Sequence, residues 1–318
     1  MRALIVGAGA VGQVFGYHLR CAGAEVTFFV RSQYADEARR GFELVALRRG
    51  ALKSTALREF TVVSSARDLA PLRFDQVYLT VPATGLLGPW LAELVEATGE
   101  ATVVVFPTGT EDVALLRASG LRDERRVQGL LSLVSYAAPL PGETRFSRQS
   151  TAYWFPPLSP TLFSGPGERT SAVITALRQG GLPARHHRDV VGASAFPTAA
   201  FMVWLLALES AGWSFSRLFA GEARDRAARG VREAIAVLTH EGARPPLYMF
   251  ALKHSGLLRF ILRLAAWVVP FPLERYVRQH FTKVGAQTRR IVEGIVARGV
   301  RAGLRVDALV QLTEKHQA

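Results

Sequence analysis

The chain has 318 residues, 49% of them hydrophobic, with a formal net charge of +13 and a pI near 10.7. This length and composition predict a globular protein of two domains. The single cysteine, Cys21, excludes an intrachain disulfide and a cysteine-rich metal site, so we expect no metal and, by default, a cytoplasmic location. The basic charge favours anionic ligands, but no nucleic-acid-binding motif or dense basic run accompanies it, so we expect no nucleic-acid partner.

A glycine-rich turn dominates the N-terminal stretch. Arg2–Val6 is predicted to be a buried strand, a helix follows as far as Ala22, and Glu25–Val30 is predicted to be a second strand. This order, with glycines spaced as G-x-G-x-x-G, is typical of a dinucleotide-binding site, where the helix start binds the pyrophosphate. The predicted cofactor-binding turn consists of Gly7, Ala8, Gly9, Ala10, Val11 and Gly12. A similar fold that has lost its cofactor is the alternative.

The residue after the second strand indicates which cofactor is bound. Sites for NAD usually carry Asp or Glu there to hold the ribose 2′-hydroxyl. This chain has Arg31, whose guanidinium suits a 2′-phosphate because it can form two parallel hydrogen bonds. The sequence therefore favours NADPH over NADH, and a solvent-exposed strand end is the alternative interpretation of Arg31.

Strands and helices alternate through the next part of the chain. The expected elements are a helix at Gln33–Arg40, strands ending at Val63, Val81 and Phe106, and a helix over Leu87–Ala97. Continuous apolar strands of this kind predict an α/β fold with a Rossmann-type, doubly wound parallel sheet. Ligands bind at the carboxyl ends of such strands. That edge should bring Pro82 and Thr108 to the cofactor, and Thr110 and Glu111 are further candidates for contact with nicotinamide or substrate.

The C-terminal part of the chain has a helical character. Val127–Ser150 is β-like, and Pro156–Gly167 is predicted to be a surface loop. Long apolar stretches at helical spacing follow. They cover Phe196–Ala211, Glu222–His240, Ala251–Val269 and Leu273–Ala302. We therefore place the domain boundary at Arg188, with a cofactor-binding domain at 1–188 and an all-α domain for substrate binding or dimerisation at 189–318.

We expect no membrane-spanning helix, because we find no uncharged apolar run of about eighteen residues. The nearest candidate, Leu257–Val269, is short and carries Arg259 and Arg263. These arginines share one helical face. The segment is predicted to be an amphipathic helix inside the helical domain or at a homodimer interface, and a membrane-surface helix is the alternative.

This order of features resembles the ketopantoate reductase (2-dehydropantoate 2-reductase) family across nearly the whole chain. The resemblance rests on the glycine turn, Arg31, the glycine-containing turn after Phe106, the pair Pro141-Gly142 and the helical C-terminal domain. Within that domain, Arg232–Val237 and His280–Thr288 resemble helices of the family. The glycine motif alone is generic, and the combination is more specific.

Membership in that family implies hydride transfer from NADPH to the ketone of a small 2-oxo acid, in a cleft between the domains. A lysine there serves as general acid, and asparagines with an acidic residue position the substrate. This chain departs from the pattern, since it has no asparagine and no lysine between Lys53 and Lys253. The family lysine corresponds to about Pro197, and the acidic residue falls near Arg289. We therefore expect a substrate other than ketopantoate.

Other residues of the helical domain could replace the missing set. His280, Lys283 and Gln287 lie three and four residues apart, which places them on one face of a helix. Lys283 or His280 is a candidate general acid, and Gln287 and Arg289 are candidates for binding substrate; a solvated helix face is the alternative. Glu209 follows an apolar run and is a third catalytic candidate, as a partly buried carboxylate, or else a helix-end charge that reaches solvent.

Two functions from different classes follow from the sequence. The leading hypothesis is an NADPH-dependent reductase that acts on a carbonyl, or an imine, of a small molecule. The alternative is a non-redox NADP(H)-binding sensor or repurposed scaffold of the same fold. The intact glycine turn and Arg31 favour the first hypothesis, whereas loss of the family's catalytic residue types favours the second.

Overall fold

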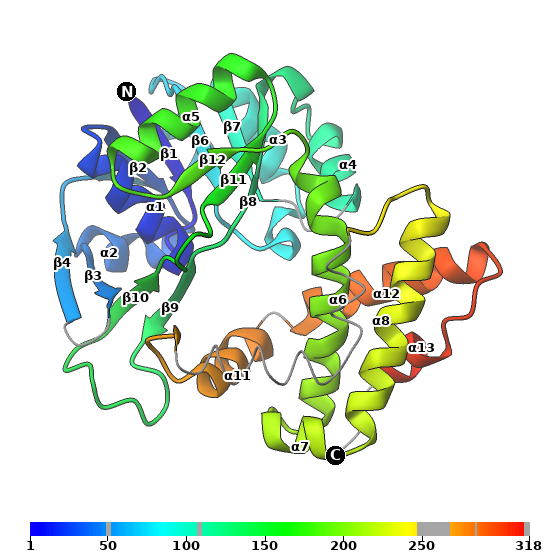
Figure 1. Cartoon of the computed structure of the whole chain (residues 1–318). Coiled ribbons are helices and arrows are strands. Elements are labelled where there is room, and N and C mark those ends of the chain that lie inside the picture. The colour runs from blue at the N-terminus through cyan, green and yellow to red at the C-terminus, as the bar shows by residue number, and fades with distance from the viewer. Residues whose placement is uncertain (49–51, 107–109, 247–267, 284, 315–318) are drawn as a thin grey trace. The chain divides into compact units, whose positions relative to one another are not determined.

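The computed structural model describes residues 1–48, 52–106, 110–246, 268–283 and 285–314 (Figure 1). The chain divides into two compact units, Met1–Val191 and Gly192–Ala318. The boundary expected from sequence, Arg188, lies just before this division. The first unit contains strands and helices, and the part of the second that the structure describes is helical.

An eight-stranded sheet forms the centre of the first unit, in the order β12-β11-β8-β7-β6-β1-β2-β5. Its strands are β1 (Arg2–Val6), β2 (Glu25–Phe29), β5 (Thr61–Val63), β6 (Gln76–Leu79), β7 (Thr102–Val105), β8 (Arg126–Leu130), β11 (Thr161–Ser164) and β12 (Ala184–His186). The strands from β8 to β5 run parallel, and β11 is antiparallel to β8. The Rossmann-type sheet is thus confirmed. The surface loop expected at Pro156–Gly167 is wrong, because its centre is the strand β11, which pairs inside the sheet.

Helices cover both faces of this sheet and separate two cores. They are α1 (Ala10–Cys21), α2 (Ala35–Arg39), α3 (Trp90–Ala97), α4 (Thr110–Ala118) and α5 (Gly167–Gln179). Because strand side chains alternate between faces, Ile5 of β1 packs with α1 and α5, whereas Leu4 and Val6 pack with α3 and α4. The continuous apolar sequence of β1 follows from this burial on two sides.

A second, four-stranded sheet has the order β4-β3-β10-β9 and joins the core on the α1 side. Its strands are β3 (Phe42–Leu47), β4 (Leu52–Leu57), β9 (Val134–Ala138) and β10 (Ser150–Trp154). Its central pair, β3 and β10, runs parallel although the two strands are far apart in the chain. The stretch predicted to be β-like ended at Ser150, where β10 begins, and nothing in the sequence predicted that β3 and β10 pair with each other.

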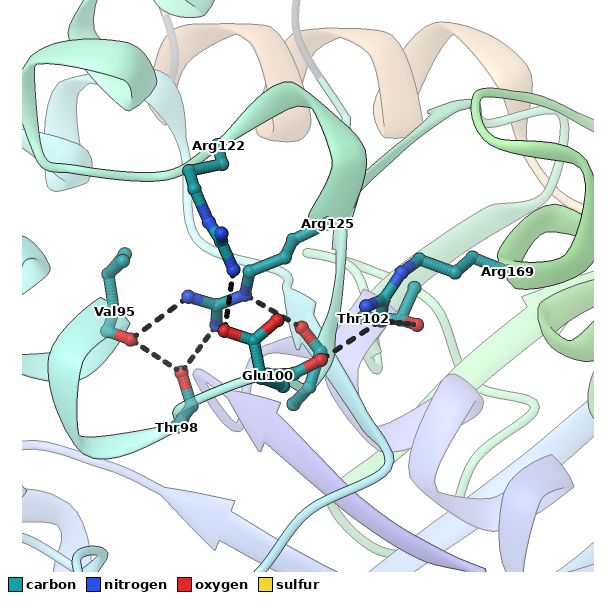
Figure 2. Close-up of polar contacts among 8 residues, drawn as sticks. Val95, Thr98, Glu100, Thr102, Arg122, Arg125 and Arg169 are labelled. Atoms are coloured by element: carbon teal, nitrogen blue, oxygen red, sulfur yellow. Dashed lines mark hydrogen bonds and ion pairs between the residues drawn. The ribbon is translucent and has the colours of Figure 1, made fainter.

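A buried arginine forms hydrogen bonds to backbone and side-chain oxygens at the amino-terminal edge of the large sheet (Figure 2). Arg125 is 5% exposed, and its guanidinium donates to the carbonyl oxygens of Ala101 at 3.1 Å and Val95 at 3.4 Å. A third hydrogen bond reaches Thr98 Oγ1 at 3.3 Å. Carbonyl groups at a helix end and before a strand need donor partners of this kind. Arg125 therefore ties the end of α3 and the start of β7 to the start of β8, at the edge away from the glycine turn.

The second unit is a helical bundle with its own core. Its described helices are α6 (Val190–Ser210), which begins just before the unit boundary, α7 (Phe215–Ala220), α8 (Glu222–His240), α11 (Leu273–Lys283), α12 (Gly285–Arg301) and α13 (Asp307–Thr313). Val203 of α6, Val231 of α8 and Val292 of α12 are fully buried in one cluster. A Cβ added at Gly230 of α8 would lie 3.1 Å from Val203 and Leu312, so this glycine permits close packing between helices. The all-α prediction is confirmed for the described residues.

Two predicted helical segments of this unit lie partly outside the described residues. The single helix predicted over Leu273–Ala302 is described as two helices, α11 and α12, on either side of residue 284, which lies outside the described residues. The predicted amphipathic segment Leu257–Val269 also lies outside them as far as residue 267.

The expectation that no uncharged apolar run is long enough to span a membrane is wrong. Helix α6 passes that test by length and composition, with a mean hydropathy of 1.8 over its most apolar window. Its residues Phe196, Val203 and Leu206 lie in the core of the helical unit. A helix that is apolar on all sides is also typical of the centre of a globular bundle, and 44% of that window is buried.

Candidate functional site

The glycine turn between β1 and α1 is a site built from backbone atoms. Gly7 has φ of +96°, and its N–H donates to the carbonyl oxygen of Phe29 at 2.9 Å. A Cβ added at Gly12 would lie 2.1 Å from the carbonyl oxygen of Gly7 and 2.6 Å from Thr80 Oγ1. Both positions therefore require glycine, the first for its conformation and the second because α1 begins in direct contact with the end of β1.

Gly9 is different, because nothing crowds it. It precedes α1 in an extended conformation, with φ −70° and ψ 177° and no side-chain cap, and a Cβ added there would meet nothing within 4 Å. The first N–H groups of α1, at Ala10 and Val11, have no acceptor within the helix. Together with the helix dipole, they make this end of α1 suitable for an anion that approaches the backbone. The open space at Gly9 fits a pyrophosphate.

Two polar side chains that were not predicted from the sequence, Thr80 and Gln13, form hydrogen bonds to the backbone of this turn, and Thr151 supports Gln13. Thr80 Oγ1 lies 2.9 Å from the carbonyl oxygen of Val6 and 3.0 Å from that of Gly7. Gln13 Nε2 donates to the carbonyl oxygen of Ala8 at 2.8 Å, and Thr151 Oγ1 donates to Gln13 Oε1 at 2.6 Å. These bonds fix three successive peptide planes of the turn. Gln13 directly follows the glycine motif, and Thr80 directly follows the neighbouring strand β6. These positions could therefore have identified both residues as neighbours of the turn.

Arg31 follows β2 and is exposed. Within the described part of the chain, its guanidinium has no ion pair or hydrogen bond, whereas nearby Arg39 pairs with Asp36 at 2.7 Å. Pro82 follows β6 and precedes the short helix η3 (Ala83–Leu86). Because β2, β1 and β6 are neighbours and run parallel, Arg31, the glycine turn and Pro82 lie along the same edge of the sheet.

The remaining candidates near this edge are only partly placed. Thr108 lies outside the described residues, and Thr110 begins α4. The predicted roles of Thr108, Thr110 and Glu111 at the nicotinamide end of the site stay predictions.

In the helical unit, an aromatic cluster surrounds the candidate His280. Its ring stacks on Tyr276 with centroids 5.3 Å apart and meets Phe281 edge-on at 4.8 Å. Burial raises the pKa of Tyr276 to about 12, so its phenol is protonated at neutral pH. Lys283 ends α11, and Gln287 lies in the first turn of α12 and is half-buried. The side chain of Lys283 lies outside what the structure describes, so the shared face expected for His280 and Lys283 is untested.

The structure brings two other predicted residues together. Arg289 Nη2 donates to Glu209 Oε2 at 2.7 Å, across 80 positions of sequence, and both side chains are less than one-third exposed. The Nε atom of Arg289 is buried and has no hydrogen-bond partner among the described residues. Glu209 is thus neither an isolated buried acid nor a free helix-end charge. The ion pair thus fixes the guanidinium of Arg289, and its Nε–H has no acceptor among the described residues.

Comparison with known proteins identifies the family. Residues 3–159 match the family model described as ketopantoate reductase PanE/ApbA. Through this stretch, just under half of the chain, the sequence resembles the ketopantoate reductase family. That family uses NAD(P)H and comprises oxidoreductases that act on CH–OH groups. No curated protein shows a significant match to the sequence.

Solved structures similar to this chain cover both units. A 2-dehydropantoate 2-reductase from Geobacter metallireducens GS-15 has a TM-score of 0.71 at 16% identity, over 98% of each chain. A PanE/ApbA family ketopantoate reductase from Ralstonia eutropha JMP134 also has a TM-score of 0.71, at 19% identity, over 98% of this chain and 96% of that one. A D-mandelate dehydrogenase solved with NADH and anilino(oxo)acetate scores 0.69 at 16% identity, over 98% and 96%. At these identities the likeness shows a shared fold.

Proposed function

We propose that the protein is an NADPH-dependent reductase that acts on the carbonyl, or an imine, of a small carboxylate-bearing molecule other than ketopantoate. The observation that carries this proposal is the turn at Gly9, which is open to a ligand and fixed by the hydrogen bonds of Thr80 and Gln13. The N–H groups at the start of α1 and this open approach together suit the pyrophosphate of a dinucleotide.

The residues of the turn and of the next strand end would hold the cofactor. The N–H groups of Ala10 and Val11 would bind the pyrophosphate, and Arg31 would bind the 2′-phosphate through its unpaired guanidinium. When bound, NADPH supplies the hydride. Gly12 and Gly7 would act indirectly, by keeping the backbone in the conformation that points these N–H groups outward.

The helical unit would bind the substrate and supply the proton. We assign Arg289 to the substrate carboxylate, because its buried Nε lacks a partner and Glu209 holds the guanidinium in one orientation. Glu209 is then a positioning residue, since the oxygen nearest to Arg289 is already an acceptor. Gln287 would orient a substrate oxygen, and His280 or Lys283 would protonate the forming alkoxide.

The second candidate function is a non-redox NADP(H)-binding protein of the same fold. One feature favours it: the resemblance puts the family lysine at about Pro197, which lies inside α6 and has no side-chain proton to give to a substrate. The helical unit has no asparagine to replace the family's substrate ligands either. In that case, NADPH would bind at the turn and would not be oxidised.

A panel of 2-oxo acids, ketones and imines, assayed by NADPH absorbance, distinguishes the two functions. Oxidation with any panel member supports a reductase, and tight binding without turnover supports the second function. For an active substrate, Arg289→Gln should raise KM about tenfold or more with little change in NADPH affinity. His280→Gln or Lys283→Ala should lower kcat by roughly two orders of magnitude or more. Full activity in both of these variants would show that the proton comes from elsewhere.

Calorimetry with NADPH and NADH tests the cofactor assignment. Arg31→Glu should weaken NADPH binding far more than NADH binding, because it replaces a phosphate ligand with a repelling charge. Arg73→Glu is a matched control, since Arg73 is also exposed but lies before β6, at the opposite edge of the sheet. Equal weakening of both cofactors by Arg31→Glu would contradict the preference for NADPH.

A further inference from the structure

A surface cavity of about 310 Å³, open to solvent, is lined by residues of α8 and α13 in the helical unit. The two helices pack side by side (Figure 1). The charged and polar residues of its wall are Arg229, Arg232 and Glu233 of α8, Arg305 of the preceding turn, and Asp307 and Gln311 of α13. All of them belong to the unit that starts at Gly192, so the cavity shares no residue with the glycine turn.

Both carboxylates of the wall already have partners. Glu233 accepts hydrogen bonds from the backbone N–H groups of Ala308 at 3.2 Å and Leu309 at 3.0 Å, which satisfies the start of α13. Asp307 accepts from Arg305 Nε at 2.8 Å. Within the described residues, neither carboxylate forms an ion pair with the other two arginines of the wall.

Arg229 and Arg232 are those two arginines. They are three residues apart and so lie on one face of α8, and both are exposed. Neither has an ion pair or a side-chain hydrogen bond to any residue in the described ranges. The arginines of α8 that do not line the cavity differ, since Arg224 pairs with Asp225 at 2.9 Å and Arg226 with Glu222 at 3.9 Å. The two arginines of α8 that form no ion pair with the described residues are thus the two that line the cavity.

We propose that this cavity binds a compact dianion, held by Arg229 and Arg232. Each guanidinium can form two parallel hydrogen bonds to a phosphate or carboxylate group, and together they would neutralise two negative charges. The volume is at the lower end of the range for small-molecule sites. A phosphate ester and a dicarboxylate share this chemistry. The site is independent of the proposed reductase activity, because none of its residues belongs to the cofactor turn or to the group around Arg289.

Calorimetric titration of the full chain with inorganic phosphate and with malonate tests the proposal and distinguishes the two ligand types. The double variant Arg229→Gln/Arg232→Gln should bind the preferred anion about tenfold more weakly or worse. Arg224→Gln removes a paired arginine of the same helix and should leave binding unchanged. Arg73→Gln, which removes an exposed arginine of the first unit, should also leave it unchanged. Unaltered binding in the double variant, or loss of binding in Arg224→Gln, would overturn the proposal.

Chemical protection gives a second measurement that needs no variant. Phenylglyoxal modifies accessible arginines, and peptide mass spectrometry reports each site. Phosphate or malonate should slow the modification of Arg229 and Arg232 several-fold and leave that of Arg73, an exposed arginine of the first unit, unchanged. If both anions leave the rates at Arg229 and Arg232 unaltered, the cavity does not bind a dianion.

Discussion

The glycine turn of the first unit and the polar groups of the helical unit are built in different ways. The turn is a stretch of backbone, and its ligand donors are N–H groups that any residue carries. The Glu209–Arg289 pair consists of two side chains on separate helices, 80 positions apart. A backbone site survives as long as the fold and its glycines survive. A side-chain site can be replaced by substitution while the fold is kept, and the solved structures similar to this chain share its fold at only 16% and 19% identity.

The largest effect is expected within the turn itself, where two glycines should respond in opposite ways. Gly12→Ala places a Cβ 2.1 Å from the carbonyl oxygen of Gly7, so α1 must move, at a cost of about 3 kcal/mol in the free energy of unfolding. Gly9→Ala meets nothing within 4 Å and has an ordinary backbone conformation, so stability should change by less than about 1 kcal/mol. NADPH affinity should nevertheless fall about tenfold or more, because the new methyl group occupies the ligand space.

Urea denaturation and calorimetry of these two variants measure both quantities. Each variant is the control for the other, since both add one methyl group to the same turn. A folded Gly12→Ala protein of normal stability would contradict the close contact between α1 and β1. Normal NADPH affinity in Gly9→Ala would remove the main support for a dinucleotide at this turn.

The next largest effect concerns the ion pair of the helical unit. A double-mutant cycle of Glu209→Gln and Arg289→Gln should give a coupling of about 1 to 2 kcal/mol in the free energy of unfolding, because both groups are mostly buried and joined at 2.7 Å. Arg305 and Asp307 form an exposed pair at 2.8 Å, with side chains 85% and 66% accessible, and the same cycle there should give a much smaller coupling. Equal couplings for the two pairs would show that Glu209 does not hold Arg289 in place.

The same contrast explains what could be predicted from sequence. The strand–turn–helix–strand order was predictable because its contacts are local and its glycines have spacing requirements of their own. Strand β11 was missed because it is short and lies within a segment rich in Pro, Ser and Gly, where only its pairing with β8 and β12 makes it a strand. The pairing of β3 with β10, and of Glu209 with Arg289, depends on long-range packing that periodicity does not encode.

The burial of His18 gives the first unit a dependence on pH. Burial lowers the pKa of this histidine, opposed by the hydrogen bond that Nδ1 donates to the carbonyl oxygen of Gly180 at 2.7 Å. Nε2 is buried without a partner, beside the rings of Tyr153 and Phe155. A protonated ring would have an N–H with no acceptor, so the unfolded chain binds this proton more tightly. The contribution of neutral His18 to the free energy of unfolding should therefore be fully present above about pH 6.5. It should decrease as the pH falls below that value.

Urea unfolding between pH 8 and pH 5 checks this dependence, which one proton limits to about 1.4 kcal/mol per pH unit. His18→Gln should be less stable at high pH, because the bond to Gly180 is altered, and should lose this part of the slope. His240→Gln is the control, since His240 is exposed at the end of α8 and its loss should leave the slope intact. A wild-type slope in His18→Gln would mean that other groups cause the acid sensitivity.

The smallest effect is expected at Thr151, which supports the turn from the four-stranded sheet. Thr151→Val removes the hydroxyl that donates to Gln13 Oε1 at 2.6 Å but keeps the shape of this buried side chain. The amide of Gln13 then loses one of its two anchors, and its bond to the carbonyl oxygen of Ala8 becomes less well oriented. We expect a loss of about 1 kcal/mol in stability and about a threefold loss in NADPH affinity.

Thr151→Ser keeps the hydroxyl and should restore NADPH affinity, although it removes a methyl group from the core. That comparison separates positioning from packing, since a purely structural role would make the serine variant at least as harmful as the valine variant. If Thr151→Val binds NADPH as tightly as the wild type, the orientation of the turn depends on the Thr80 hydroxyl and the glycines alone.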